Sequence, residues 1–329
     1  MPAIHIATET LIAIERAIER DQGNSYRGWL GKVLPHIGDA YRSDEEPHRS
    51  HMGASLIGGE CARHIWYNFR WATRGAFSGT MLRLFNRGHL EEGRFIACLL
   101  TIGVQVIQQD ENGKQFRISH AEGHFGGSGD GVGVGIPDLT AGMPALLEFK
   151  THNDKSFTQL AGRNWKDYWL TMLNPKLPKV QFQGEGVRLA KFEHYVQAQQ
   201  YMRKMGLAVC LYMAVNKDND LFYGELIPLD TLIADQFLER AERLIYHGEP
   251  PKRISETPGY WKCRYCDDRP VCHLGAMPDR NCRTCKYSEP VNTGNGAWEC
   301  QRVNPAVPID KARQLVGCEH YTVAPYYGR

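Results

Sequence analysis

The chain has 329 residues, of which 42 % are hydrophobic and 23 % charged, and its net charge is +2. This is the composition of a soluble globular protein with room for one large domain or two ordinary ones. No apolar run approaches the roughly 20 residues needed to span a membrane, so we expect no membrane association, and so small a net charge neither favours nor excludes nucleic acid.

The first fifty residues are predicted to be helical and then loop-like. Leu11, Ile14 and Ile18 follow helical spacing, and no basic stretch precedes an apolar one. We therefore expect an amphipathic helix rather than a secretion signal, and a cytoplasmic location.

The middle of the chain changes from helical to strand-like patterns. Helices are expected from about Gly59 and over 80–101, the second with Thr80 as its N-cap. Alternating apolar residues between Gly, Asn-Gly and Pro-Asp turns then predict strands at 104–110, 114–119, 131–136 and 145–151.

The segment 152–187 has no clear period and is interpreted as a long, mobile loop. Its Trp165 and Trp169 either stack on bases along a DNA path or lie on an ordinary surface loop. Beyond it the pattern predicts a helix, two strands and another helix, at 188–205, 208–216, 221–229 and 229–247.

This order of elements predicts an α/β protein with a central mixed β-sheet flanked by helices. We expect three consecutive segments: a helical segment at 1–50, a core at 51–275, and a Cys-rich, metal-binding C-terminal appendage at 276–329.

The strand "ALLEFK" carries the first candidate site residues. Glu148 and Lys150 share one of its faces, and an aspartate near them would suggest a metal site rather than an exposed strand end. Asp138 gives a literal Pro-Asp…Glu-x-Lys string but occupies a turn-like sequence. Folding the hairpin about 137–144 returns Asp130 to Glu148, so we favour Asp130 over Asp138.

Two helices offer further candidates. Glu92 lies on the apolar stripe of the 80–101 helix, where a carboxylate is costly unless it is paired or metal-bound, and His89 adjoins it. An ion pair with an arginine would also explain Glu92, and a satisfied core histidine would explain His89. In the later helix His194, Gln197 and Tyr201 fall on one face, which alone is a weak signal.

Eight of the ten cysteines form two groups. Thiolates at Cys61, Cys263, Cys266 and Cys272 suit either an iron–sulfur cluster or zinc. The spacing of the second group predicts a tetrahedral structural zinc, with His320 able to replace one ligand; its members are Cys282, Cys285, Cys300 and Cys318. Cys98 and Cys210 lie in apolar runs and are interpreted as core residues.

The ordered set of motifs resembles the PD-(D/E)XK nuclease superfamily, and within it the RecB-like, CRISPR-associated type of iron–sulfur exonuclease encoded by phages or prophages. The motifs are Arg-Gly-His89, Gly-x-x-Asp130, Glu148-Phe149-Lys150 and Gln197-x-x-x-Tyr201, and they lie within roughly 55–275. The resemblance implies a restriction-endonuclease-like core. It also implies that Mg²⁺ or Mn²⁺ is held by His89, Asp130, Glu148 and the Phe149 carbonyl, with Glu92 a further candidate.

In the same family Lys150 would orient or deprotonate the attacking water, and Gln197 and Tyr201 would steady the site or touch DNA. A [4Fe–4S] cluster on Cys61, Cys263, Cys266 and Cys272 is implied as well. The function implied is metal-dependent exonuclease action on DNA ends, serving a single-strand annealing or recombination partner, in the bacterial host cytoplasm. A structure-specific endonuclease or nickase of this fold, and a non-catalytic DNA-binding protein that keeps it, are the alternatives.

Overall fold

The chain forms two compact units that are interleaved along the sequence. Residues 1–44, 77–118 and 128–231 make up unit 1, and residues 45–76, 119–127 and 232–329 make up unit 2. The computed structural model describes residues 3–43 and 48–327. This division differs from the three consecutive segments expected from the sequence, because the N-terminal residues join the main sheet and the C-terminal ones join a core with residues 66–72.

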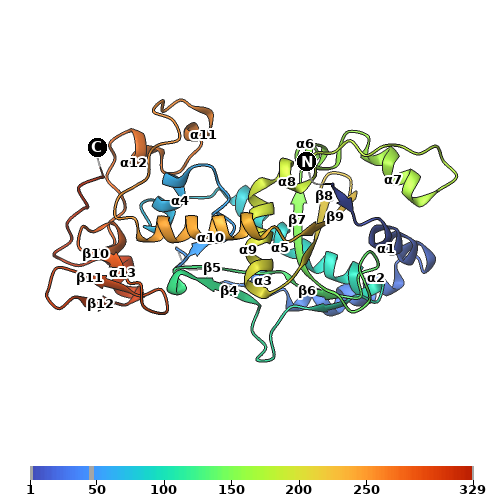
Figure 1. Ribbon diagram of the computed structural model, residues 1–329, viewed down its shortest axis with the longest axis horizontal. Helices are drawn as coiled ribbons and strands as arrows, with labels where there is room; N and C mark the ends of the chain where they lie inside the picture. The colour runs from blue at the N-terminus through green and yellow to red at the C-terminus, as the bar shows by residue number, and fades with distance from the viewer. Residues whose placement is uncertain (1–2, 44–47, 328–329) are drawn as a thin grey trace. The chain divides into compact units, whose positions relative to one another are not determined.

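Unit 1 is built on a six-stranded mixed sheet. Only the two central strands, β7 (Pro144–His152) and β8 (Val209–Asn216), run parallel, and every residue of β8 is buried. The order across the sheet is β1 (His5–Ile6), β9 (Phe222–Pro228), β8, β7, β6 (Gly131–Val134) and β3 (Gln105–Ile107). The predicted mixed α/β architecture is thus present, and β1 covers an edge that sequence patterns did not reveal (Figure 1).

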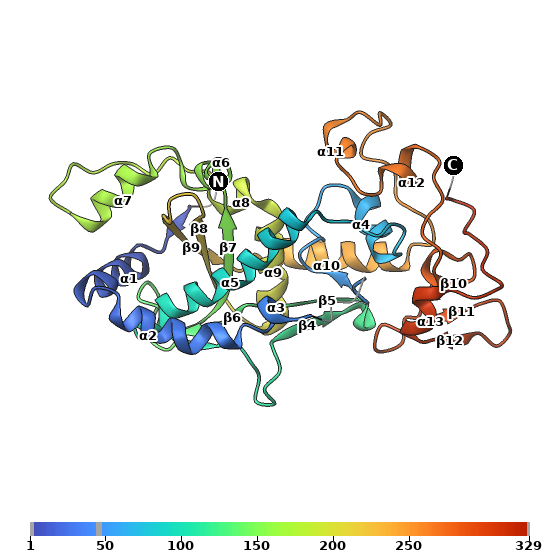
Figure 2. The same cartoon turned by 180° about the vertical axis from the view of Figure 1, so that it is seen from behind.

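Helices flank this sheet on both faces. In Figures 1 and 2, which view the chain from opposite sides, α9 (Phe192–Met205) and α5 (Gly79–Thr101) lie on opposite faces of β7. Phe95 of α5 stacks on Phe149 of β7 with ring centroids 5.0 Å apart. The remaining helical elements of unit 1 are α1 (Thr8–Arg20), α2 (Asn24–Val33), η1 (Leu34–His36), α3 (Gly38–Tyr41), α6 (Asp154–Ala161), α7 (Trp165–Leu173) and α8 (Gly186–Ala190).

The prediction of a long loop at 152–187 is wrong, because three short helices occupy much of it. Trp165 is 2 % exposed and donates its indole N–H to the Phe222 carbonyl at 2.9 Å, and Trp169 is also buried. These tryptophans therefore pack the fold and have no ring surface free for stacking on bases.

Two local expectations for α5 also need correction. Its N-cap is Ser78, whose hydroxyl accepts from the Met81 N–H, and not Thr80. The apolar stripe buries only its second half, since Met81 and Phe85 are 40 % and 41 % exposed. The loop-like end of the first fifty residues includes residues 44–47, which lie outside the described residues.

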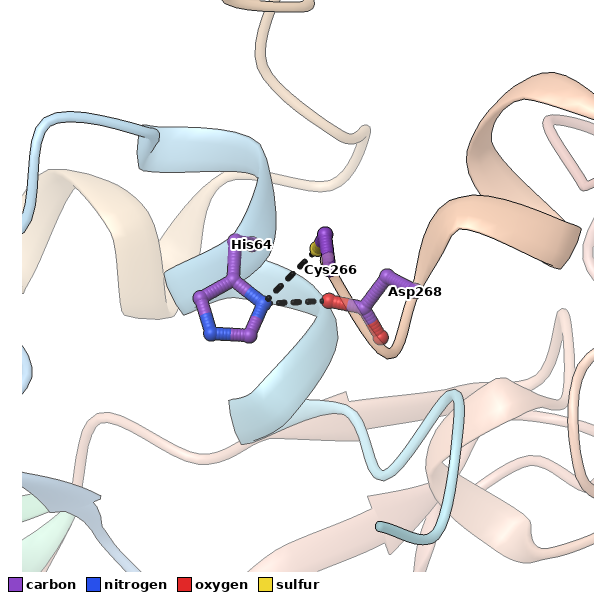
Figure 3. Close-up of side chains that lie close together, drawn as sticks. All are labelled: His64, Cys266 and Asp268. Atoms are coloured by element: carbon purple, nitrogen blue, oxygen red, sulfur yellow. Dashed lines mark hydrogen bonds and ion pairs between the residues drawn. The ribbon is translucent and has the colours of Figure 1, made fainter. Parts of the chain in front are cut away.

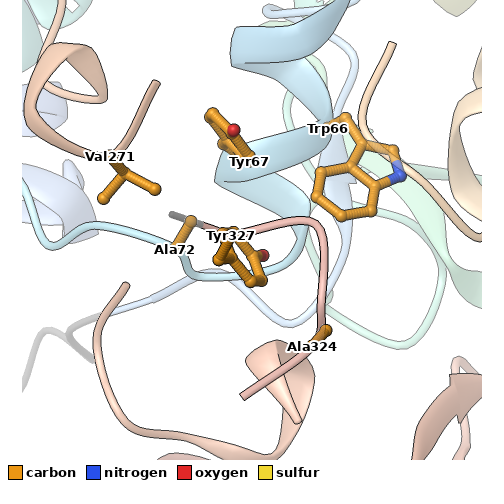
Figure 4. Packing of buried hydrophobic residues seen from close by; sticks show 6 residues of the cluster. All are labelled: Trp66, Tyr67, Ala72, Val271, Ala324 and Tyr327. Atoms are coloured by element: carbon orange, nitrogen blue, oxygen red, sulfur yellow. The ribbon is translucent and has the colours of Figure 1, made fainter. Parts of the chain in front are cut away.

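Unit 2 is held together by aromatic packing. Trp66 and Tyr67 of α4 (Ala62–Phe69) pack with Ala72, Val271, Ala324 and Tyr327, as Figure 4 shows. Arg283 is 1 % exposed, stacks on Trp71 and Trp298 at 3.8 and 4.5 Å, and donates to the Gln314 side chain and two backbone carbonyls. The C-terminal residues are therefore part of this core rather than a separate appendage.

The other elements of unit 2 are short, apart from α10. They comprise α10 (Thr231–Tyr246), α11 (Trp261–Arg264), α12 (Arg269–His273), η3 (Cys282–Thr284) and α13 (Lys311–Val316). Two three-stranded sheets are present. The first contains β2 (Met52–Gly53), β5 (Phe125–Ser128) and β4 (Arg117–His120), and the first two residues of β4 belong to unit 1. The second contains β10 (Ser288–Pro290), β11 (Trp298–Cys300) and β12 (Val307–Ile309). A turn of helix η2 (Ala121–Gly123) separates β4 from β5. In the part of the chain that the structure describes, no helix combines the length and apolarity that crossing a membrane requires.

Candidate metal centre

The centre lies where strands β6 and β7 part. Gly131 pairs with Leu147 in the antiparallel ladder, so Asp130 and Glu148 are the next residues on the two strands. In the described chain the ladder ends there, and the Phe149 N–H donates to Asp130 Oδ2 at 2.8 Å instead of to a strand carbonyl. The hairpin thereby places Asp130 beside Glu148.

The glycines of β6 allow the close packing of the hairpin. Gly131 has φ +150°, and a Cβ there would lie 3.0 Å from the Ile107 carbonyl oxygen. A Cβ on Gly133 would lie 3.0 Å from Leu147 Cδ2. The high glycine content of "GDGVGVG" therefore fits tight sheet packing, with its register fixed by Leu147.

Asp138 is engaged elsewhere, at the N-terminus of α1. Its two carboxylate oxygens accept from the backbone N–H groups of Glu9 and Thr10 at 2.9 and 2.7 Å, and from the Thr10 hydroxyl at 2.6 Å. It thus satisfies N–H groups that a helix leaves unpaired in its first turn, a structural task that explains an aspartate at this turn.

Glu148 is completely buried and only half satisfied. Oε1 forms an ion pair with Lys150 Nζ, whereas Oε2 has no hydrogen-bond partner within the described residues. Burial, together with the Asp130 carboxylate, raises the pKa of Glu148 to about 7. A buried carboxylate oxygen without a hydrogen-bond partner is costly unless it binds a proton or a cation.

Two further carboxylates interact electrostatically with Glu148. Burial raises the pKa of Glu92 to about 8, and Asp130, Asp39 and Glu148 add repulsion that Lys150 only partly offsets. Burial also raises the pKa of Asp130, against the attraction of Lys150, the Phe149 N–H and His89. His89 and Glu92 therefore belong to the same electrostatic neighbourhood as Asp130, although they come from α5 on the other face of β7.

Asp39, on α3, is a member of this neighbourhood that sequence reasoning missed. Its carboxylate raises the pKa of both Glu92 and Asp130, while it also forms an ion pair with Arg42 at 3.1 Å. The segment around it, "IGDAYRSD", has no motif and no period that would mark it.

Lys150 does not have the lowered pKa that a lysine needs in order to deprotonate water. Burial alone would lower its pKa, but the carboxylates of Glu148 and Asp130 raise it above the ordinary value. A divalent cation that took those carboxylates as ligands would weaken this attraction and shift the pKa downward.

The fourth motif, Gln197-x-x-x-Tyr201, lies on α9. Gln197 and Tyr201 are both buried, and their side chains are hydrogen-bonded to each other. Burial and the Glu148 carboxylate raise the pKa of Tyr201, so its hydroxyl stays protonated and can only donate or accept hydrogen bonds.

The donor set fits a hard divalent cation. Carboxylate oxygens are the ligands that Mg²⁺ and Mn²⁺ prefer, and here Glu148, whose buried Oε2 is unpartnered, interacts electrostatically with the carboxylates of Asp130 and Glu92. The donor atoms of these three described residues do not all lie within 4.8 Å of one another, so a cation would draw them inward. Burial is the largest cause of their raised pKa values, and repulsion between neighbouring acids adds to it.

The first group of cysteines lines one pocket in unit 2. Cys61, Cys263, Cys266 and Cys272 all contribute to its wall, together with His64 and Asp268. Burial and neighbouring thiolates, Cys61 among them, raise the pKa of both Cys263 and Cys272. Sulfurs that converge on one space and repel one another fit a metal centre that would neutralise them.

One wall of this pocket is a hydrogen-bonded triad. His64 Nδ1 lies 2.6 Å from Asp268 Oδ2 and 3.6 Å from Cys266 Sγ, as the dashed lines in Figure 3 mark. Asp268 and the Cys266 thiolate raise the pKa of His64 to about 11. Among the described residues this triad, and no set of the four sulfurs, brings its donor atoms within 4.8 Å of one another.

The second group of cysteines gathers around η3. Cys282 and Cys285 bracket a tight turn closed by the Cys285 N–H donating to the Cys282 carbonyl at 3.0 Å, and Cys300 pairs with Ser288 across β10 and β11. Burial and the thiolates of Cys318, Cys285 and Cys300 raise the pKa of Cys282 to about 11. Zinc bonds of about 2.3 Å hold sulfurs about 3.8 Å apart, so zinc would draw these four inward.

Comparison with known proteins gives limited similarity. No protein-family model and no curated protein sequence matches the chain. Among solved structures, the alkaline exonuclease LHK-Exo from Laribacter hongkongensis, alone or in complex with dAMP, is 15 % identical with a TM-score of 0.35, covering 66 % of this chain and 90 % of its own. The protein SSO0001 is 15 % identical with a TM-score of 0.34, covering 75 % and 95 %. At these TM-scores the functional argument rests on the site itself.

Proposed function

We propose that the chain is a metal-dependent DNA exonuclease of the PD-(D/E)XK type. The observation that carries the proposal is the buried, unpartnered Oε2 of Glu148, whose carboxylate pairs with Lys150 and interacts electrostatically with those of Asp130 and Glu92. A structural ion pair with Lys150 needs only one acid. A site for a divalent cation needs several carboxylates, and three acids interact here.

Asp130 and Glu148 would hold Mg²⁺ or Mn²⁺, with His89, Glu92 and the Phe149 carbonyl as further ligands. When bound, such an ion neutralises phosphate charge and lowers the pKa of a coordinated water. Lys150, which shares the Glu148 face of β7, would orient the attacking water through Nζ. It would deprotonate that water only once a bound cation had lowered the pKa of Lys150. Gln197 and Tyr201 would fix the position of Lys150 from α9.

The test is cleavage of end-labelled linear DNA and of closed circular DNA, with Mg²⁺ or Mn²⁺, by anaerobically purified protein. An exonuclease shortens only the linear DNA from its ends; an endonuclease or nickase opens the circle. Lys150→Ala and Asp130→Asn should abolish cleavage, and Asp138→Asn is the matched control that should retain it. Wild type that binds DNA without cutting it would indicate the non-catalytic alternative, and cutting by Asp130→Asn would contradict the site.

We further propose a [4Fe–4S] cluster on Cys61, Cys263, Cys266 and Cys272, supported by the single pocket they line, and a structural zinc on Cys282, Cys285, Cys300 and Cys318. Iron, acid-labile sulfide and zinc contents test both. Cys263→Ser should lose iron and keep zinc, and Cys300→Ser the reverse. If either variant keeps its full metal content, the corresponding assignment fails.

A DNA end processed in this way would expose a single strand, so we propose an annealing or recombination protein as the partner, in the cytoplasm of a bacterial host. Co-purification of such a protein with the wild-type chain would not by itself test this proposal. The relevant measurement is annealing of the products by the candidate partner in the same reaction.

A further inference from the structure

A continuous row of hydrogen bonds in unit 1 leads from a lysine to a histidine on α9. Lys191 Nζ donates to Ser156 Oγ at 2.6 Å, and Ser156 Oγ lies 3.4 Å from His152 Nδ1. His152 Nε2 lies 3.1 Å from the Tyr212 hydroxyl, which lies 2.9 Å from His194 Nδ1. None of these residues has a place in the proposed catalytic set.

The chemistry of the groups gives the row a direction. An ammonium group can only donate, so Ser156 Oγ accepts from Lys191 and its own proton is free for His152 Nδ1. When that proton is donated to His152 Nδ1, His152 carries its own proton on Nε2 and donates it to the Tyr212 oxygen. The Tyr212 proton is left for His194 Nδ1, and His194 therefore carries its proton on Nε2.

The outer nitrogen of His194 is thus an N–H donor that is not used internally. Its Nε2 has no hydrogen-bond partner in the part of the chain that the structure describes. Burial and the positive charge of Lys150, with His152 and Lys191, lower the pKa of His194 to about 2, so the ring is neutral. A neutral ring whose other nitrogen accepts from tyrosine keeps this tautomer.

The position of His194 on α9 indicates which kind of group its Nε2–H contacts. It shares one face of α9 with Gln197 and Tyr201, spaced three and seven residues along. Tyr212 pairs with Glu148 across β7 and β8, and His152 shares the face of β7 that carries Glu148 and Lys150. The row therefore runs along the same face of the sheet as the candidate centre, and it begins at the cation Lys191.

We propose that His194 Nε2–H donates a hydrogen bond to a phosphate oxygen of the bound DNA strand, with its tautomer set by the row from Lys191 through Tyr212. The inference rests on the proposed DNA substrate. It makes His194 a DNA-contacting residue, and Lys191, Ser156, His152 and Tyr212 positioning residues that act through it.

The tautomer is tested first, by proton–nitrogen correlation spectra of protein labelled with ¹⁵N-histidine. The signals of His194 are assigned as those missing in His194→Gln. The expected pattern is protonated Nε2 and bare Nδ1 across the neutral pH range. In Tyr212→Phe and Lys191→Met the two tautomers should mix. Protonation on Nδ1 in wild type, or an unchanged pattern in both variants, overturns the inference.

The contact is tested second, by binding of a short DNA oligonucleotide in EDTA, which keeps the DNA intact. His194→Leu should weaken binding roughly three- to tenfold, the range of one neutral hydrogen bond. His36→Leu, at an exposed histidine of unit 1, is the control and should leave affinity unchanged. An oligonucleotide with methylphosphonate linkages, in which a methyl group replaces one phosphate oxygen, should narrow the difference between wild type and His194→Leu.

The two arms separate this inference from the proposed function. If wild type neither binds nor cuts DNA, the proposed function fails and the inference fails with it, whatever the tautomer. If wild type cuts DNA but His194→Leu binds the oligonucleotide as tightly as wild type, only the inference is overturned.

Discussion

The charge imbalance of the candidate centre makes a quantitative prediction for Glu92→Gln. Burial and neighbouring acids raise the pKa of Glu92 from 4.5 to about 8, so ionising it opposes folding. This cost is absent below pH 4.5, grows as pH rises, and is complete above about pH 8. Near pH 7 it amounts to about 3 kcal/mol, from 1.36 kcal/mol for each unit between 4.5 and 7.

Glu92→Gln should therefore stabilise the protein in EDTA, and the gain should depend on pH. For a unit of this size, about 3 kcal/mol corresponds to a rise in Tm of roughly 6–12 °C at pH 7, with almost no change near pH 4.5. Thermal unfolding followed by circular dichroism at a series of pH values measures it. With Mn²⁺ the difference in Tm between Glu92→Gln and wild type should shrink or reverse, because the wild-type carboxylate gains a cation.

Equal pH dependence of Tm for wild type and Glu92→Gln would refute the reasoning, since the acid would then be ordinarily solvated. Destabilisation at every pH would show instead that Glu92 makes a stabilising contact. Glu60→Gln, at an exposed acid of unit 2, is the control for a general effect of removing one negative charge.

Three further outcomes are expected. Mn²⁺ affinity of the wild type, measured by calorimetry without DNA, should fall as pH drops from about 8 to 6, because Glu92 and Glu148, with pKa values of about 8 and 7, must release protons to bind; a flat profile would contradict a carboxylate site. Asp138→Ala should cost about 1 kcal/mol of stability by uncapping α1 while leaving Mn²⁺ affinity intact, and a loss of affinity would transfer the ligand role to Asp138. Gly133→Ala should cost roughly 1–3 kcal/mol because its Cβ would crowd Leu147, whereas Gly28→Ala, open on all sides in α2, should not destabilise.

The pairing of Asp130 with Glu148 could be inferred from the sequence because a hairpin is a local structure. The turn residues mark where the chain reverses, and strand alternation then fixes which residues share a face. The same reasoning assigned Asp138 to the turn, but its contacts with α1 come from a segment 129 residues away, which no local pattern reveals.

The errors have a common physical origin in tertiary contacts. Trp165 and Trp169 belong to short helices that are stabilised by packing rather than by their own periodicity, so 152–187 read as a loop. Asp39 joins the acidic neighbourhood through the placement of a four-residue helix. The row from Lys191 to His194 is likewise assembled from four elements, and only His194 stood out in the sequence.

The interleaving of the two units bears on the order in which the chain can acquire structure during synthesis. Strand β1 at His5–Ile6 has its partner at Glu225–Leu226, so the sheet of unit 1 stays open at one edge until more than two thirds of the chain has left the ribosome. Residues 45–76 and 119–127 must wait longer still, for the segment after 232. Neither unit corresponds to one continuous stretch of sequence, so a fragment cut near residue 231 would leave unit 2 segments without their core.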